Sequence, residues 1–163
     1  MVKNNYFTAD DERFMQMAID LSVENVANGG GPFGAVIVRE SEVIATGVNR
    51  VTDENDPTAH AEVKAIREAC AKLHCFKLDG CTVYTSCEPC PMCLSALDWA
   101  GVERIIYGNT KDDAKAIAFD DSFIYNQIAL AHDKRSIPCI NFMREEALAA
   151  FRAWRDKEDK VIY

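Results

Sequence analysis

The sequence predicts an α/β sandwich with helices on both faces of a sheet, and two observations support this class. Some segments place apolar residues at helical spacing, whereas others are short runs rich in valine and isoleucine. The two kinds of segment alternate along the chain, which is the order expected where helices cover a sheet. We expect one domain over residues 1–163, since this length buries a sizeable core and neither a repeat nor a linker interrupts it.

The first elements follow from helical spacing and from glycine positions. Residues 10–28 are predicted to form a helix, because their apolar residues share one stripe and the glycines at 29–31 end it. Residues 33–39 and 43–48 are predicted strands. The short polar segment 40–42 between them predicts a hairpin.

The remaining elements continue the alternation. We expect further helices at 58–74, 91–99, 111–117, 122–130 and 144–157. We expect further strands at 81–85, 104–107 and 137–141.

The charge of the chain narrows the class of partner. The formal net charge is −8 and the pI is about 4.9. Proteins that bind nucleic acids usually carry an excess of Lys and Arg, so we expect a small, near-neutral partner and no nucleic acid. No apolar run reaches the roughly 20 residues of a membrane span, and no signal peptide is evident. We therefore expect no membrane association and a cytoplasmic location.

Seven cysteines are present, and their positions favour metal or redox chemistry. An odd number in a chain without a secretion signal argues against a disulfide framework. Three of the seven fall within residues 87–93.

Two short motifs carry the candidate chemistry. Residues 58–62 read TAHAE, and residues 88–93 read EPCPMC. They offer the imidazole of His60 and the thiols of Cys90 and Cys93, a donor set that suits Zn²⁺. The two cysteines are three apart at a predicted helix start, which puts both sulfurs on one face and lowers their pKa values.

Three protein ligands leave the fourth tetrahedral position to water, as in catalytic zinc sites. Zinc lowers the pKa of that water, and a neighbouring carboxylate can carry its proton. Glu62 is the candidate for this role. Residues two apart on a regular helix diverge by about 200°, so His60 and Glu62 can share one site only at the helix start.

Other interpretations of the motifs remain open at this point. Cys87 is three residues before Cys90 and could complete a closed, structural Cys₃His zinc site. A zinc-stapled binding module without catalysis would use that site. A redox pair of Cys90 and Cys93 is a further alternative, although it leaves His60 and Glu62 without a role.

The combination of H-x-E with P-C-x-x-C is the signature of zinc nucleobase deaminases. On these motifs the chain resembles the cytidine-deaminase-like superfamily over most of its length. The resemblance implies a three-layer α/β/α sandwich with a five-stranded mixed sheet. It also implies that the two motif helices pack side by side, with one zinc ion per subunit at their N-termini.

Further segments resemble bacterial guanine deaminases. The segment 119–125 and the terminal Tyr163 favour guanine over other bases, because the two motifs are shared by several deaminases. The matching segments are GGPFGAV at 30–36, NDPTAHAE at 55–62, YTSCEPCPMC at 84–93, FDDSFIY at 119–125 and FRAWR at 151–155.

This resemblance implies substrate contacts at the end of the second strand and near residue 120. Asn49 would hydrogen-bond the purine, although Asn is also common in turns. Asp121 would bind the ring N–H of guanine and assist proton transfer, although it could instead cap the following helix. The backbone of Ala61 would contact the base.

Three aromatic residues are implied in the same way. Phe33 and Trp99 would line the pocket, and the alternative for each is a place in the core. Family members are dimers that exchange the C-terminal segment, here about 141–163. Tyr163 would then close the site of the partner subunit, and the alternative is a frayed tail.

The implied reaction is hydrolysis of guanine to xanthine and ammonia by zinc-bound hydroxide, with Glu62 as proton shuttle. The nearest alternative is a tRNA wobble-adenosine deaminase, which shares both motifs but usually needs basic surface. A cytosine or guanosine deaminase also remains open, since the sequence does not give the pocket volume.

Overall fold

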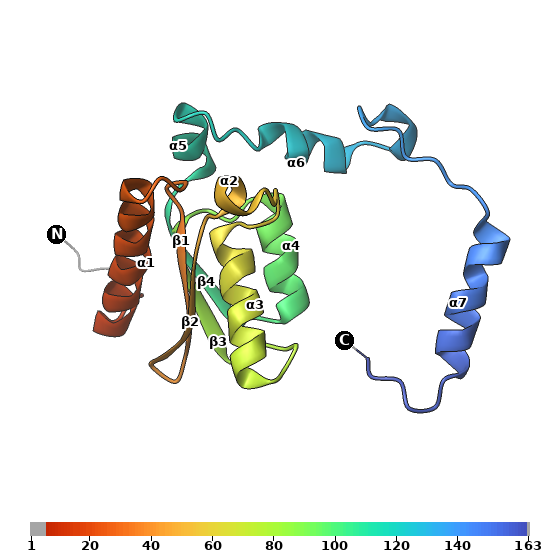
Figure 1. Cartoon of the computed structure of the whole chain (residues 1–163), viewed down its shortest axis with the longest axis horizontal. Coiled ribbons are helices and arrows are strands. Elements are labelled where there is room, and N and C mark those ends of the chain that lie inside the picture. The colour runs from red at the N-terminus through yellow and green to blue at the C-terminus, as the bar shows by residue number, and fades with distance from the viewer. Residues whose placement is uncertain (1–5, 163) are drawn as a thin grey trace. The chain divides into compact units, whose positions relative to one another are not determined.

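The computed structural model describes residues 6–162 and divides them into two compact units. The first unit runs to Asp121, and the second begins at Ser122 (Figure 1). The second unit therefore begins well before residue 141, where the exchanged segment was expected to start. Among the described residues, no helix is long and apolar enough to span a bilayer.

The first unit follows the predicted order of elements closely. Every predicted helix and strand before residue 122 is present, and the short helix α2 is added. Its helices are α1 (Ala9–Ala27), α2 (Val51–Glu54), α3 (Ala61–Leu73), α4 (Pro91–Ala100) and α5 (Lys111–Ala116). Its strands are β1 (Gly34–Arg39), β2 (Glu42–Val48), β3 (Cys81–Cys87) and β4 (Arg104–Asn109).

The four strands form one mixed sheet in the order β2-β1-β3-β4. Strand β1 pairs antiparallel with β2 and β3, and β3 pairs parallel with β4. Helix α1 covers one face of the sheet, and α3 and α4 lie side by side on the other (Figure 1). The α/β/α layering is therefore as predicted.

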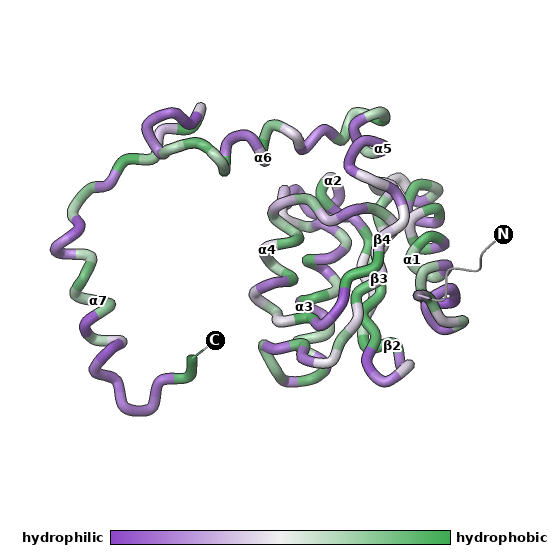
Figure 2. The backbone as a smooth tube through the Cα atoms, turned by 180° about the vertical axis from the view of Figure 1, so that it is seen from behind, coloured by the Kyte–Doolittle hydropathy of each residue, from purple (hydrophilic) through white to green (hydrophobic). Residues whose placement is uncertain are grey.

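Alternation along β1 builds a core on each face of the sheet. Ala35 and Ile37 pack among residues of α3 and α4, whereas Val36 and Val38 pack against Phe14 of α1. All four β1 residues are buried, because a strand in the centre of a three-layer sandwich has no solvent-facing side. Figure 2 shows the same pattern, with hydrophobic strands between helices that carry both colours.

Gly47 allows α3 to lie directly on β2. A Cβ atom at this position would be 2.1 Å from the carbonyl oxygen of Ala61 and 2.7 Å from the backbone nitrogen of Ala65. Both contacts are with backbone, which cannot move aside without shifting the helix. The absence of a side chain at Gly47 therefore sets the position of the N-terminal turn of α3.

The second unit corrects the prediction of a five-stranded sheet. It contains α6 (Ser122–Ala129), the 3₁₀ turn His132–Lys134 and α7 (Arg144–Asp156), and residues 137–141 are not a strand. Among the described residues the sheet has four strands. The described part of this unit offers no strand for 137–141 to pair with, and an unpaired segment cannot form a ladder. Ile137 and Ile140 are accordingly 75% and 83% exposed.

Candidate active site

Two helix starts bring three metal-binding side chains together. His60 is the N-cap residue of α3, with extended backbone (φ −73°, ψ 157°), and Cys90 is the N-cap residue of α4 (φ −64°, ψ 168°). Cys93 lies in the first turn of α4 and is fully buried. The ligand atoms of these three residues all lie within 4.8 Å of one another. The structure thus brings together the three ligands predicted from the motifs.

The spacing of these atoms fits zinc. His60 Nδ1 lies 3.6 Å from Cys90 Sγ and 3.4 Å from Cys93 Sγ. Zn–S bonds of about 2.3 Å and Zn–N bonds of about 2.0 Å, at the tetrahedral angle, separate sulfur and nitrogen by about 3.5 Å. One imidazole with two thiolates is also a donor set that zinc favours over the harder Mg²⁺ and Ca²⁺. These three residues would hold one zinc ion.

The electrostatics of the group favour a thiolate at Cys90. Its sulfur accepts a hydrogen bond from the Cys93 thiol and contacts His60, and these contacts lower the pKa of Cys90 to about 4 against the opposing effect of burial. The proton that Cys93 shares with Cys90 raises the pKa of Cys93. The Cys90 contact also raises the pKa of His60, although burial alone would lower it. The positive N-terminal ends of α3 and α4 add to this preference for negative sulfur.

Cys87 does not belong to this group. Its Sγ lies 3.6 Å from the carbonyl oxygen of Thr110, and burial raises the pKa of its thiol to about 11. Among the described residues, the candidate metal-binding group consists of His60, Cys90 and Cys93. This arrangement argues against the closed four-ligand site.

Glu62 lies beside the group in the first turn of α3. Because His60 is the N-cap rather than a helical residue, the two side chains need not diverge by the angle of a regular helix. The Glu62 side chain is 6% exposed, and its burial raises the pKa of the carboxyl. It accepts a hydrogen bond from Thr85 Oγ1 at 3.1 Å and interacts with the Cys93 thiol. A buried carboxylate is therefore fixed next to the candidate zinc site.

Asn49 is brought next to His60 by a closed loop. The backbone N–H of Arg50 donates to the carbonyl of Ala59 at 2.9 Å, so the two ends of the loop meet. Asn49 is buried, and its Oδ1 accepts from the N–H of Val51 at 3.3 Å. Among the described residues, the hydrogen bond found for this side chain is the one at Oδ1.

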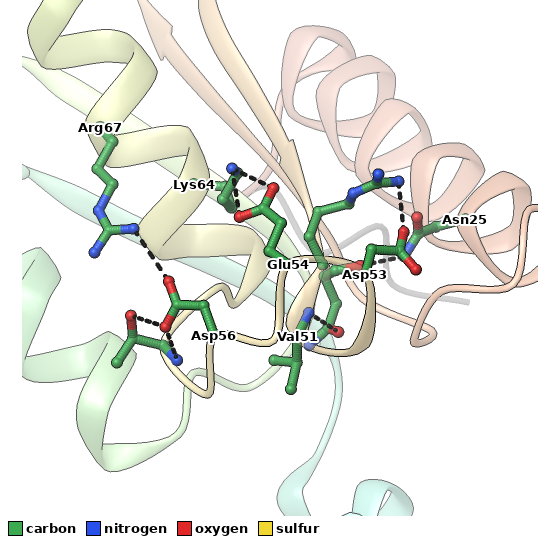
Figure 3. A network of polar contacts seen from close by, with 10 residues as sticks. Asn25, Val51, Asp53, Glu54, Asp56, Lys64 and Arg67 are labelled. Atoms are coloured by element: carbon green, nitrogen blue, oxygen red, sulfur yellow. Dashed lines mark hydrogen bonds and ion pairs between the residues drawn. The ribbon is translucent and has the colours of Figure 1, made fainter.

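Ion pairs hold the loop between Asn49 and His60 against α3. Lys64 pairs with Glu54 at 2.8 Å and Arg67 with Asp56 at 3.7 Å, as Figure 3 shows. Each pair is partly exposed, so each adds little to stability by itself. Their effect is to give the loop a defined path over the helix that begins at the candidate metal site.

An aromatic contact places residues 119–121 beside the loop that precedes β1. The rings of Phe33 and Phe119 pack edge to face, with centroids 4.9 Å apart and an interplanar angle of 90°. Asp121 follows and is half-buried. Burial, together with the nearby negative charge of Cys90, raises the pKa of Asp121. Asp121 is therefore close enough to the metal-binding group to respond to its charge.

The fold and this group of residues match a known family. Residues 8–109 match the zinc-binding region of cytidine and deoxycytidylate deaminases. The chain belongs to this deaminase family. It is a zinc-dependent hydrolytic enzyme, and zinc is its cofactor.

Relatives of this deaminase act on different substrates. Guanine deaminase from Bacillus subtilis is 50% identical over 153 residues, which are 93% of this chain and 98% of the relative, and its X-ray structure matches with a TM-score of 0.91. A solved guanine deaminase from Nitrosomonas europaea is 36% identical, covers 70% of this chain and 65% of that chain, and has a TM-score of 0.63. A tRNA-specific adenosine deaminase from Aquifex aeolicus is 42% identical over 96 residues, which are 59% of this chain and 64% of the relative.

The remaining residues predicted for the site of this deaminase differ in their placement. Ala61 is the first residue of α3 and is fully buried directly after His60, so its backbone lies at the candidate metal site. Trp99 lies near the C-terminal end of α4, is 66% exposed, and is about 13 Å along the helix from Cys90. Within this chain, Trp99 is therefore not brought to the site. Tyr163 lies outside the described residues, and its role stays a prediction.

Sequence reasoning gave no role to Thr85. It lies within the matching segment 84–93, but a threonine in a strand is ordinary by itself. The available signal was its place at the end of the predicted strand 81–85, three residues before the motif at 88–93. Thr85 is 1% exposed, and only the fold shows that its hydroxyl reaches Glu62 from strand β3.

Proposed function

We propose that this deaminase hydrolyses guanine to xanthine and ammonia. The observation that carries the proposal is the convergence of His60, Cys90 and Cys93 next to the buried carboxylate of Glu62. The choice of guanine is supported by the 50% identity with the Bacillus subtilis enzyme, which extends over 93% of the chain.

Glu62 moves the protons of the reaction. Zinc, when bound, supplies a Lewis acid that lowers the pKa of a water molecule toward neutrality. Glu62 accepts a proton as the water oxygen adds to C2 of guanine, and delivers it to the adjacent ring nitrogen. It then carries the second water proton to the departing amine, so that ammonia leaves and the C2 carbonyl of xanthine forms. The raised pKa of Glu62 suits a group that must both take and give a proton.

The substrate contacts come from the loops around the metal group. The amide nitrogen of Asn49 donates to a purine acceptor, and the backbone of Ala61 meets the edge of the base. Asp121 accepts the ring N–H of guanine, and Phe33 forms an apolar wall that Phe119 supports. These four roles are proposals supported by the burial of Asn49 and by the influence of Cys90 on Asp121.

We further propose a homodimer that exchanges the segment 141–163. Its apolar side chains are unusually exposed in the chain taken alone, with Phe142 at 83% and Phe151 at 74%. Such residues gain by packing against a second subunit. In this arrangement Tyr163 would close the partner's site.

The cysteines bear on the proposed location. Seven free cysteines fit a cytoplasmic location, where thiols stay reduced.

A substrate panel tests the proposal. The zinc-loaded protein is incubated with guanine, guanosine, adenine, cytosine and a tRNA anticodon stem, and released ammonia is measured. We expect guanine to give the highest kcat/KM by at least about 100-fold, because a site that hydrogen-bonds the base rejects substrates that leave its polar groups unpaired. The net charge of −8 opposes the tRNA stem. A preference for the stem, or for any other base, would refute the assignment.

A further inference from the structure

A buried amide on α1 joins the two loops that carry proposed substrate contacts. Asn25 lies near the end of α1 and is 4% exposed. Its Nδ2 donates to the carbonyl oxygen of Gly31 at 2.8 Å and to that of Asn49 at 2.9 Å. Both N–H groups of one amide are thereby used. Since Gly31 is two residues before Phe33, Asn25 ties the loop of Phe33 to Asn49.

The surroundings of Asn25 leave room for this side chain and little else. A Cβ atom at residue 30 would lie 2.4 Å from Nδ2 of Asn25, so the amide occupies the space that any side chain at Gly30 would need. The N–H of Asn49 donates to the carbonyl of Phe33 at 3.2 Å. The backbone of Asn49 is thus held from two sides, by Phe33 at its N–H and by Asn25 at its carbonyl.

The Asn25 bonds reach residues beyond the helix that carries it. Figure 3 shows Asn25 extending from α1 toward the segment that bears Val51 and Asp53. The ladder of the sheet ends just before this point, since Gly34 and Val48 are the last pair between β1 and β2. Beyond that pair, the separation of the two loops depends on the bonds that Asn25 and Asn49 make.

We propose that Asn25 is a positioning residue for substrate binding, which fixes Asn49 and the loop of Phe33 in the arrangement that receives the purine. The proposal rests on the proposed function, in which Asn49 contacts the base. Asn25 itself touches no substrate. Its replacement therefore weakens binding only as far as Asn49 and the loop of Phe33 are displaced.

Two variants at residue 25 and one control test this role. Asn25→Asp keeps the shape of the side chain but removes both N–H donors, and the neutral Asn25→Ser is too short to reach either carbonyl. Ser22→Ala is the matched control, because Ser22 is buried on the same helix and its hydroxyl donates to the carbonyl of Ile19 within that helix. Hydrogen exchange at residues 31–34 and 49–51, and KM and kcat for guanine, are measured on the zinc-loaded proteins.

We expect both variants at residue 25 to speed exchange in the two loops and to raise KM about tenfold with little change in kcat, the effect of about one hydrogen bond. The control should change neither quantity. A double-mutant cycle with Asn49→Ala separates positioning from general stability, because Asn25→Ser should raise KM less once the Asn49 amide is gone than it does in the wild-type protein.

The outcomes distinguish this proposal from the proposed function. Unchanged exchange in both loops would overturn the positioning role whatever the substrate is. Faster exchange with additive effects in the cycle would also overturn it, since the loss would then be independent of Asn49. If guanine is not turned over, the proposed function fails, whereas the exchange data still decide whether Asn25 fixes the two loops.

Discussion

Replacing the Glu62 carboxyl by an amide tests the proposed proton transfer most sharply. Glu62→Gln preserves the size of the side chain and leaves an oxygen to accept from Thr85, so the fold and the zinc site should persist. It removes the buried carboxyl group that α3 brings next to the three candidate ligands. We therefore expect normal zinc content and almost no turnover.

The magnitude follows from burial and from the number of steps served. Glu62 is 6% exposed, so bulk water has poor access to replace it as a proton acceptor. One general acid–base group contributes roughly 10²- to 10⁴-fold. Since Glu62 serves both the attack and the departure of ammonia, we expect a loss near the upper end, about 10⁴-fold in kcat or about 5 kcal/mol.

The assay is steady-state ammonia release from guanine, with zinc measured in the same samples. Glu68→Gln is the matched control, because Glu68 is an exposed glutamate on the same helix, and it should keep full activity. A Glu62→Gln protein that retains zinc and more than about a tenth of wild-type kcat would refute the proton-transfer role.

Four further predictions follow from the same structure. Thr85→Val should lower kcat about tenfold with unchanged zinc content, because valine lacks the hydroxyl that orients Glu62. Thr85→Ser, which keeps a hydroxyl, should have nearly wild-type kcat. Asp11→Asn should lower the free energy of unfolding at pH 7, and by steadily less as the pH falls from about 4 toward 2, as judged by urea denaturation. Gly47→Ala should destabilise the protein by about 2 kcal/mol and reduce zinc content, because its methyl group would overlap the backbone of α3. Deletion of residues 161–163 should lower kcat/KM for guanine about tenfold, the effect of one lost contact, while leaving zinc content unchanged.

The sign of the Asp11 prediction comes from its hydrogen bonds. Burial alone would raise the pKa of Asp11, but bonds from Thr8, Arg104 and Tyr84 outweigh it and hold this pKa well below its usual range. A depressed pKa in the folded state gives a stabilisation that is fully present above the unfolded pKa of about 4. This gain shrinks progressively as the pH falls from there through the lowered pKa of the folded state. Losses in Asp11→Asn that are equal at pH 7 and pH 2 would contradict the assignment. For Thr85, a serine variant as slow as the valine variant would contradict the role of the hydroxyl in orienting Glu62.

Much of the site could be predicted because its signals are local. Helix starts, ligand types and the spacing of Cys90 and Cys93 are all set by neighbouring residues. The requirement that His60 stand at a helix start came from the geometry of two residues on one turn, and the structure confirms it. The four strands of the first unit were predicted from apolar runs bounded by turn residues.

The errors arose where the outcome depends on distant residues. Residues 137–141 have the composition of a strand, but a strand needs a partner, and the described part of the second unit offers none. Thr85 and Asn25 acquire their roles from contacts 23 and 24 residues away along the chain. No pattern within a short window contains such partners, so these roles required the fold.

The central claim is that three protein ligands hold zinc and that the Glu62 carboxylate lies beside it. Zinc K-edge X-ray absorption on the loaded protein tests the ligand set most directly. We predict two sulfur ligands near 2.3 Å and, near 2.0 Å, one nitrogen ligand and one oxygen ligand from exchangeable solvent. A shell of three sulfurs that falls to two in Cys87→Ser would show a closed structural site and contradict the catalytic assignment.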